Sequence, residues 1–286
     1  MFEVISPSDE APAAPTTDAA PLQRARGRAR LAVKHDGRVS RIDTLFQEGS
    51  AKLRLPKPVS DACEAVVLNT SGGLTGGDRF SVSVKVGDNA SADVAGQAFE
   101  KIYKSSGGVA EMETELEVGA GARLDWLPQP AILFDRAAMR RRTSVHLASD
   151  STLIAVEGLV FGRAAMGESV ETGTVHDGWR VYRDGRLIFA DAFSVEGPVA
   201  DILGGKAVLG DARATATVLC HGPMAAAMLD PVRELLAEAG LPAGASLVAD
   251  MLVVRLAASS AQALVAGLVP VLTLLRGRDL PRVWFC

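Results

Sequence analysis

Residues 69–86 constrain the fold more than any other stretch of the chain. They open with a glycine-rich turn, GGLTGGD, and then change to strict alternation, with apolar residues at every second position from Phe80 to Val86. A period of two over this length is typical of a half-buried β-strand. The paired glycines before it are Gly72, Gly73, Gly76 and Gly77. They indicate positive φ angles or close backbone approach, so we interpret the motif as a tight strand connection.

Short alternating segments of the same kind recur from residue 28 to residue 189, at intervals of roughly 8–12 residues. Two Asp-Gly pairs, at 36–37 and 184–185, are typical of hairpin turns. Two short strands are expected around Glu157, at 153–156 and 159–161. No fixed-length sequence repeat is evident. The pattern favours an all-β sandwich, barrel or stacked sheet.

The pattern becomes helical after residue 220. Residues 224–239 place Met, Leu and Val on one helical stripe that Gly240 ends. Residues 247–256 are predicted to form a strand. A second helix is expected through about residue 275, with Ser259 or Ser260 as its N-cap. The sequence therefore predicts a large β body followed by two helices.

Composition bounds the organisation of the chain. Residues 1–21 are rich in Pro and Ala and are predicted to be a disordered tail. Residues 22–286 are expected to be one domain, with a β body over about 22–220 and an αβα part over about 221–286. The longest apolar run, 263–275, is too short to cross a bilayer, and no secretory signal is predicted.

Charge and cysteine usage exclude several classes. A formal net charge of −4 argues against a nucleic-acid-binding design, and no membrane partner is expected. The three cysteines form neither a disulfide framework nor a zinc-ligand spacing, which favours a cytoplasmic location. The glycine cluster lacks the Lys-Ser/Thr pair of a phosphate-binding loop, the four histidines are scattered, and no GxSxG motif occurs. We predict no catalytic residues and no fixed metal site.

Five acidic residues lie in apolar or glycine-rich surroundings: Asp78, Glu100, Asp135, Glu157 and Glu168. An unpaired buried carboxylate costs several kcal/mol, so each should be paired, protonated or facing water. Ion pairs with nearby Lys101, Arg136 and residues 140–142 are one interpretation. The other is a set of carboxylates along a polar passage, since oxygen ligands without a fixed cage suit transient handling of a divalent cation.

Six sequence blocks occur together and in order: NTSGGLTGGDRFSVSV, QAFEKIYKSSGG, GARLDWLPQPAILFDRA, EGLVFGRAAMGE, RDGRLIF and LPRVW. Together they resemble the UreD (UreH) family of urease accessory proteins, from about residue 22 to the C-terminus. The resemblance implies a β-helix-like stack of strands with two C-terminal α-helices.

The resemblance also implies a non-enzymatic role. UreD-like proteins are chaperones of urease maturation that bind the urease apoprotein and a UreF-type partner, which recruits a UreG-type GTPase. Nickel would be handled transiently, without a tightly bound cofactor, and the five carboxylates are the candidates to line its passage. Two alternatives stay open: a metal-dependent hydrolase on a β scaffold, and an adaptor that never touches metal. The weakly charged helix near residues 260–275 would pack on the β body or meet the UreF-type partner.

Overall fold

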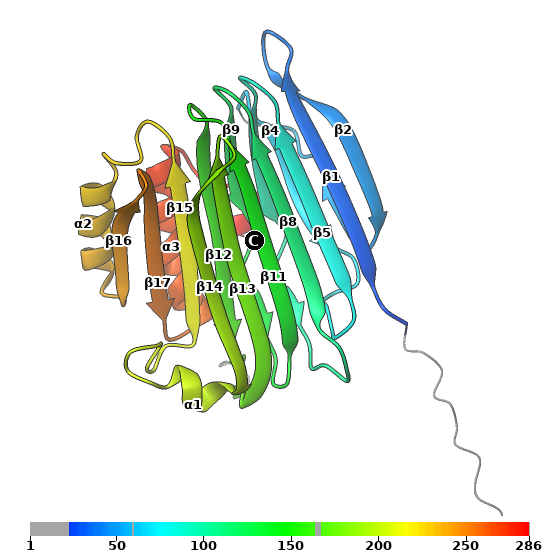
Figure 1. The fold of residues 1–286 in the computed structure, drawn as a ribbon, viewed down its shortest axis with the longest axis vertical. Helices are drawn as coiled ribbons and strands as arrows, with labels where there is room; N and C mark the ends of the chain where they lie inside the picture. Colours follow the sequence, from blue (N-terminus) through cyan, green and yellow to red (C-terminus); the bar gives the residue numbers. More distant parts are fainter. Residues whose placement is uncertain (1–22, 59, 164–166, 286) are drawn as a thin grey trace, which may run out of the picture.

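Two large β-sheets form the body of the protein (Figure 1). The computed structural model describes residues 23–58, 60–163 and 167–285, so the predicted tail lies outside the described residues. Sheet A contains, in spatial order, β14 (Arg186–Pro198), β13 (Thr172–Arg183), β11 (Ala138–Leu147), β8 (Ala110–Val118), β5 (Arg79–Val86), β1 (Arg26–His35) and β2 (Ser40–Gly49). Sheet B contains β16 (Ala243–Val248), β17 (Met251–Ala258), β15 (Ala214–His221), β12 (Thr152–Phe161), β9 (Arg123–Leu127), β6 (Ser91–Gly96), β4 (Cys63–Asn69) and β3 (Ala51–Arg54), with β7 (Glu100–Ile102) and β10 (Ala131–Leu133) attached through β12.

The chain alternates between the two sheets from β4 to β13. Strands β5, β8, β11 and β13 are parallel neighbours in sheet A, and β4, β6, β9 and β12 are parallel neighbours in sheet B. Successive passes therefore stack as coils of a β-solenoid, which confirms the predicted mainly β, β-helix-like fold with C-terminal helices. Each coil needs only inward-facing apolar residues and turns, so it leaves no fixed-length repeat in the sequence.

Strand β12 shows how side-chain alternation assigns residues to the two faces of sheet B. Leu153, Ala155 and Leu159 belong to the core between the sheets, whereas Ile154 and Val156 belong to a second core on the opposite face. Because both faces are covered, the strand is apolar almost throughout. The prediction of two short strands here was wrong, since Thr152–Phe161 is continuous and carries Glu157 in its interior. Strand β13 is likewise continuous, over 12 residues from Thr172 to Arg183.

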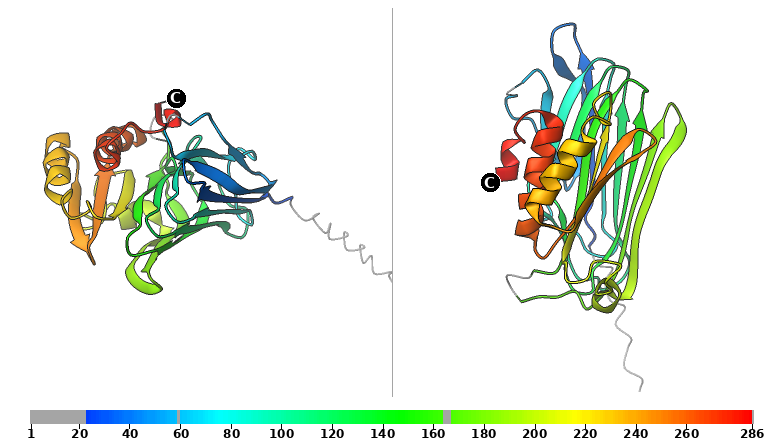
Figure 2. Two further views of the ribbon diagram at one scale, coloured as in Figure 1. Left: turned by 90° about the horizontal axis from the view of Figure 1, so that it is seen from above. Right: turned by 90° about the vertical axis from the view of Figure 1, so that its left-hand side faces the viewer.

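The helices cover sheet B on the side away from sheet A (Figure 2). They are α2 (Leu229–Ala239) and α3 (Ala261–Arg276), while the short α1 (Val199–Leu203) follows β14 and the 3-10 helix η2 (Arg282–Phe285) ends the chain. Ser260 is the N-cap of α3 and accepts a hydrogen bond from the N–H of Ala263 at 3.1 Å. The buried side of α3, with Leu264 and Leu268, packs into the second core. The packing interpretation therefore accounts for that face of α3. No helix in the described ranges is long and apolar enough to cross a membrane.

Two local predictions near the C-terminus were wrong. The single strand expected at 247–256 is a hairpin of β16 and β17, whose turn residues Ala249 and Asp250 have φ angles of 47° and 66°. Alanine is an unusual residue in a left-handed turn, so the pattern of turn residues did not predict this hairpin. Helix α2 begins at Leu229 rather than at 224. Pro231 explains this late start, because proline is tolerated only in the first turn of a helix.

Candidate functional site

The glycine motif forms the predicted tight connection into β5. Gly72, Gly73 and Gly77 have φ angles of 78°, 148° and 91°, which side-chain-bearing residues rarely adopt. Gly76 is required for a different reason: a Cβ there would lie 2.0 Å from the Ser105 hydroxyl oxygen. Both expectations for the motif, positive φ and close approach, are thus confirmed.

Asp78 stabilises this connection from within. Its side chain is 4% exposed, and its two carboxylate oxygens accept hydrogen bonds from the backbone N–H groups of Ala25 and Thr75, each at 2.8 Å. These contacts join the start of β1 to the glycine motif. Asp78 therefore has a structural task that needs both of its oxygens, and it does not line the cavity described next.

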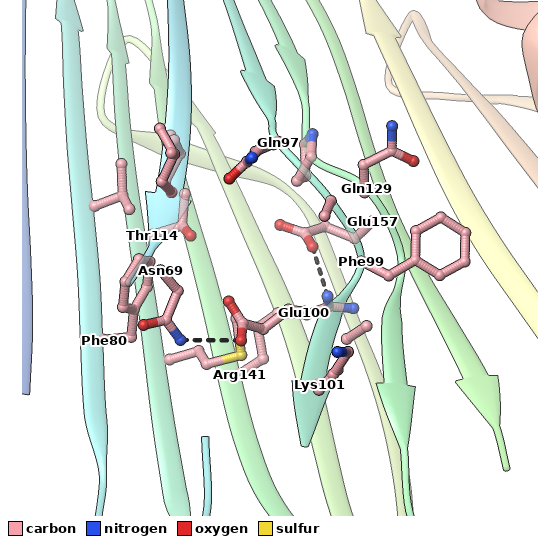
Figure 3. A pocket seen from close by; sticks show the side chains of 18 of the residues that line it. Asn69, Phe80, Gln97, Phe99, Glu100, Lys101, Thr114, Gln129, Arg141 and Glu157 are labelled. Carbon is pink, nitrogen blue, oxygen red and sulfur yellow. Dashed lines mark hydrogen bonds and ion pairs between the residues drawn. The ribbon is translucent and has the colours of Figure 1, made fainter. Parts of the chain in front are cut away.

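A cavity of about 280 Å³ lies beside the motif, between the two sheets (Figure 3). Apolar residues of both sheets, such as Phe80, Val82 and Trp126, form much of its wall. Its polar lining comes from Asn69, Gln97, Glu100, Lys101, Glu113, Thr114, Gln129, Arg141 and Glu157. We call this space the central cavity. It brings together two of the predicted carboxylates, which are 57 residues apart in the sequence.

Glu100 lies at one side of the central cavity, on β7. Its carboxylate accepts a hydrogen bond from the side-chain amide of Asn69 at 3.0 Å (Figure 3). Burial raises the pKa of Glu100 to about 7, and the hydrogen bond from Asn69 acts against that shift. The carboxylate therefore changes charge near neutral pH, where a small change in its surroundings alters its affinity for a cation.

Glu157 faces the same cavity from β12 and is held by groups from both sheets. One oxygen is 2.6 Å from Nη1 of Arg141, while the other accepts hydrogen bonds from Trp126 at 3.2 Å and Thr143 at 3.4 Å. Burial raises the pKa of Glu157, and the Arg141 guanidinium acts against that shift. The carboxylate is thus buried yet fully hydrogen bonded, as its cost of burial requires.

The other two predicted carboxylates lie elsewhere. Asp135 accepts hydrogen bonds from the N–H groups of Glu171 and Thr172 at 3.0 and 3.1 Å, and it pairs with Arg136 as the sequence suggested. The hydrogen bond from Thr172 is the main cause of its lowered pKa. Glu168 pairs with Arg163 at 2.6 Å. Neither residue lines the central cavity, and their part in a passage stays a prediction.

Arg141, Glu157 and Asp177 form one buried ionic group. The sequence patterns did not predict the roles of Arg141 and Asp177. They are register partners on the parallel strands β11 and β13. Two N–H groups of Arg141 donate to the two oxygens of Asp177 at 2.9 and 2.6 Å. A signal was present: Arg141 shares the alternation of Met139 and Val145, so it points inward, whereas its neighbours in the Arg-Arg-Arg run point outward.

Two further cavities border this ionic group. One, of about 490 Å³, is lined by Glu157, Asp177 and Asp191, and the other, of about 280 Å³, is lined by Arg141, Asp177 and Asp191. Within the described residues, no three His, Cys, Asp or Glu side chains gather as a metal site. The arrangement therefore offers carboxylate and amide oxygens in succession rather than one closed cage, which suits passing contact with a divalent cation.

Comparison with known proteins finds similarity along nearly the whole chain. Residues 25–285 match the family described as UreD urease accessory protein. The urease accessory protein UreD of Rhizobium etli is 52% identical over 264 residues, covering 92% of this chain and 96% of the relative. The protein of the same name from Brucella suis is 46% identical over 270 residues, covering 92% and 95%. The chain therefore belongs to the UreD family of urease accessory proteins.

Proposed function

We propose that this protein is a non-catalytic chaperone of urease maturation, which binds the urease apoprotein together with a UreF-type partner and, through it, a UreG-type GTPase. In this role it works in the cytoplasm and gives nickel a protected route toward the urease active site. Nickel is the cargo, and it is handled transiently. Membership of the UreD family supports the maturation role.

The central cavity is the observation that supports a route through the protein. It lies inside the body, and its wall carries Glu100 and Glu157, whose carboxylates are held by Asn69 and Arg141. Unlike the buried Asp78, both carboxylates border open space, where a passing cation can reach them. We infer that the Glu100 and Glu157 carboxylates bind the cation briefly as it is transferred.

The metal-dependent hydrolase has no comparable observation in its favour. A hydrolytic zinc or nickel site needs about three protein ligands around one open position. The described part of the chain brings no such group together. The adaptor that never touches metal differs from our proposal in one measurable respect, which is whether the cavity carboxylates affect nickel delivery.

Deletion and restoration of the gene test the maturation role. Cells that carry the whole urease operon would be compared with a strain that lacks this gene and with a strain in which it is restored. We expect inactive, nickel-poor urease in the deletion strain and recovery of both activity and nickel on restoration. Active urease with normal nickel content in the deletion strain would rule out the proposed function.

A further inference from the structure

The three cavities meet at one ionic group, formed by Arg141, Glu157 and Asp177. Glu157 lines the central cavity and the 490 Å³ cavity, Asp177 lines the latter and the third cavity, and Arg141 lines the third and the central cavity. Each member thus borders two of the spaces. In Figure 3 the Arg141 and Glu157 side chains meet at the wall of the central cavity. The shared residues place this group at the boundary between the central cavity and the other two.

Arg141 occupies the position between the two carboxylates. It reaches Glu157 on sheet B at 2.6 Å and Asp177 on sheet A at 2.6 and 2.9 Å, so its guanidinium joins the sheets across the interior. Its side chain is 3% exposed. A planar guanidinium that donates to two carboxylates satisfies the oxygens that a divalent cation would otherwise bind.

We propose that Arg141 is the gate residue of the nickel route. It is the counter-ion of Glu157 and Asp177 at the junction, the point where the three cavities meet, and it keeps a passing cation from remaining bound to these carboxylates. This inference rests on the proposed function. With Arg141 in place the junction carries two carboxylates against one guanidinium, a net charge of −1. Without it, two buried carboxylates face a cation at short range in a medium of low dielectric, which strengthens their attraction.

The charge balance explains why an arginine suits this position. A divalent cation that displaced the guanidinium would neutralise both carboxylates, so it competes with Arg141 for the same oxygens. Release follows when the guanidinium returns to the carboxylates. A group that bound nickel without such a competitor would store the metal rather than pass it on.

Arg141→Met tests the proposal, because methionine keeps much of the length of the side chain and removes its charge. The variant would be co-expressed with urease and its accessory proteins, purified as the accessory complex, and exposed to Ni²⁺ before gel filtration. We expect nickel retention to rise at least about tenfold over the wild-type complex, because an opposing charge is removed at contact distance. Nickel should also raise the melting temperature of the variant chain, and urease activation should fall.

Two further variants show whether a change in nickel retention comes from the altered charge or from damage to the fold. Arg141→Met with Asp177→Asn restores the net charge of −1, so its nickel retention should return to the wild-type level. Arg276→Met is the matched control. Arg276 is equally buried between two carboxylates, Asp93 and Asp125, but it borders none of the three cavities. Loss of Arg276 should leave nickel retention unchanged.

A folded Arg141→Met complex with wild-type nickel retention would overturn the inference. If that variant does not fold, Arg141→Lys carries the test, since a single ammonium cannot reproduce the two-pronged contact with Asp177 while it holds Glu157. Increased retention in Arg141→Lys supports the gate, and wild-type retention overturns it. Failure of the proposed function would be seen separately, as active urease in the deletion strain.

Discussion

Two buried arginine clusters lie on opposite faces of sheet B, and only one of them borders the three cavities described above. The inner cluster joins Arg141 to Glu157 and Asp177 between the sheets. The outer cluster lies beneath the end of α3, where Arg276 contacts Asp93 and Asp125, each at 2.8 Å. Arg278 and Arg123 add contacts to the same two carboxylates, at 2.7 and 3.0 Å.

The net charges of the inner and outer clusters have opposite signs. The inner cluster has two carboxylates against one guanidinium, whereas the outer cluster has two carboxylates against three. An excess of negative charge beside open space attracts a cation, and an excess of positive charge in a packed site does not. The comparison teaches that burial and ion pairing alone do not mark a functional group. In our proposal, the inner cluster is distinguished by the cavities beside it and by its net negative charge.

Arg276→Met is expected to have the largest effect on stability. It leaves Asp93 and Asp125 buried with only Arg123 and Arg278 as partners, so the free energy of unfolding should fall by about 3 kcal/mol, typical of breaking one side of a buried ion pair. Denaturant unfolding of the full chain measures this. Urease activation per folded chain should stay at the wild-type level, and a specific loss of activation without a loss of stability would erase the distinction between the two clusters.

Glu100 should make nickel delivery depend on pH. Because its pKa in the folded protein is about 7, against an ordinary value of 4.5, its carboxylate gains charge as pH rises through 7. Activation of apo-urease by the purified complex should therefore increase between about pH 6 and 8. Glu100→Gln should flatten that increase, and Glu168→Gln, which alters a carboxylate outside the central cavity, should leave it in place.

The same shift affects stability with a defined sign. A carboxylate with a raised pKa in the folded state contributes stability that is complete below pH 4.5 and is lost as pH rises through 7. Glu100→Gln should therefore gain stability relative to the wild-type protein over that window. An unchanged difference between the two proteins from pH 4.5 to 8 would contradict the raised pKa.

The smallest expected effect comes from the start of α3, which covers the face of sheet B that holds the outer cluster. Ser260→Ala removes the hydrogen bond to the N–H of Ala263 and should cost about 1 kcal/mol of unfolding free energy. Thermal unfolding detects a change of this size. Urease activation should be unaffected, and a large loss of activation would show that the outer face takes a direct part in function.

The sequence predicted features that depend on neighbouring residues and missed those that depend on register. Alternation from Phe80 to Val86, the Asp184-Gly185 turn and the Ser260 cap each follow from a few adjacent residues, and the structure has all three. The continuity of β12 across Glu157 was missed because a lone charge in an apolar run looks like an interruption.

The candidate site was predicted in part for the same reason. Glu100 and Glu157 were chosen because they are acidic residues in apolar surroundings, and both line the central cavity. Arg141 and Asp177 are 36 residues apart, and only the parallel pairing of β11 with β13 places them side by side. Such register depends on how long the intervening coil is, which alternation within one strand does not determine.

The nickel content of urease from cells that express Glu157→Gln, measured beside Asp125→Asn, tests the central claim most directly. Both changes remove one charge from a buried carboxylate that contacts a buried arginine, but only Glu157 borders the cavities. We predict urease that contains about tenfold less nickel with Glu157→Gln, comparable to the loss when a residue next to a bound metal's ligands is altered. Asp125→Asn should give normal nickel once chain levels are matched. Equal nickel content in both strains, with the accessory complex intact, would contradict a route between the sheets.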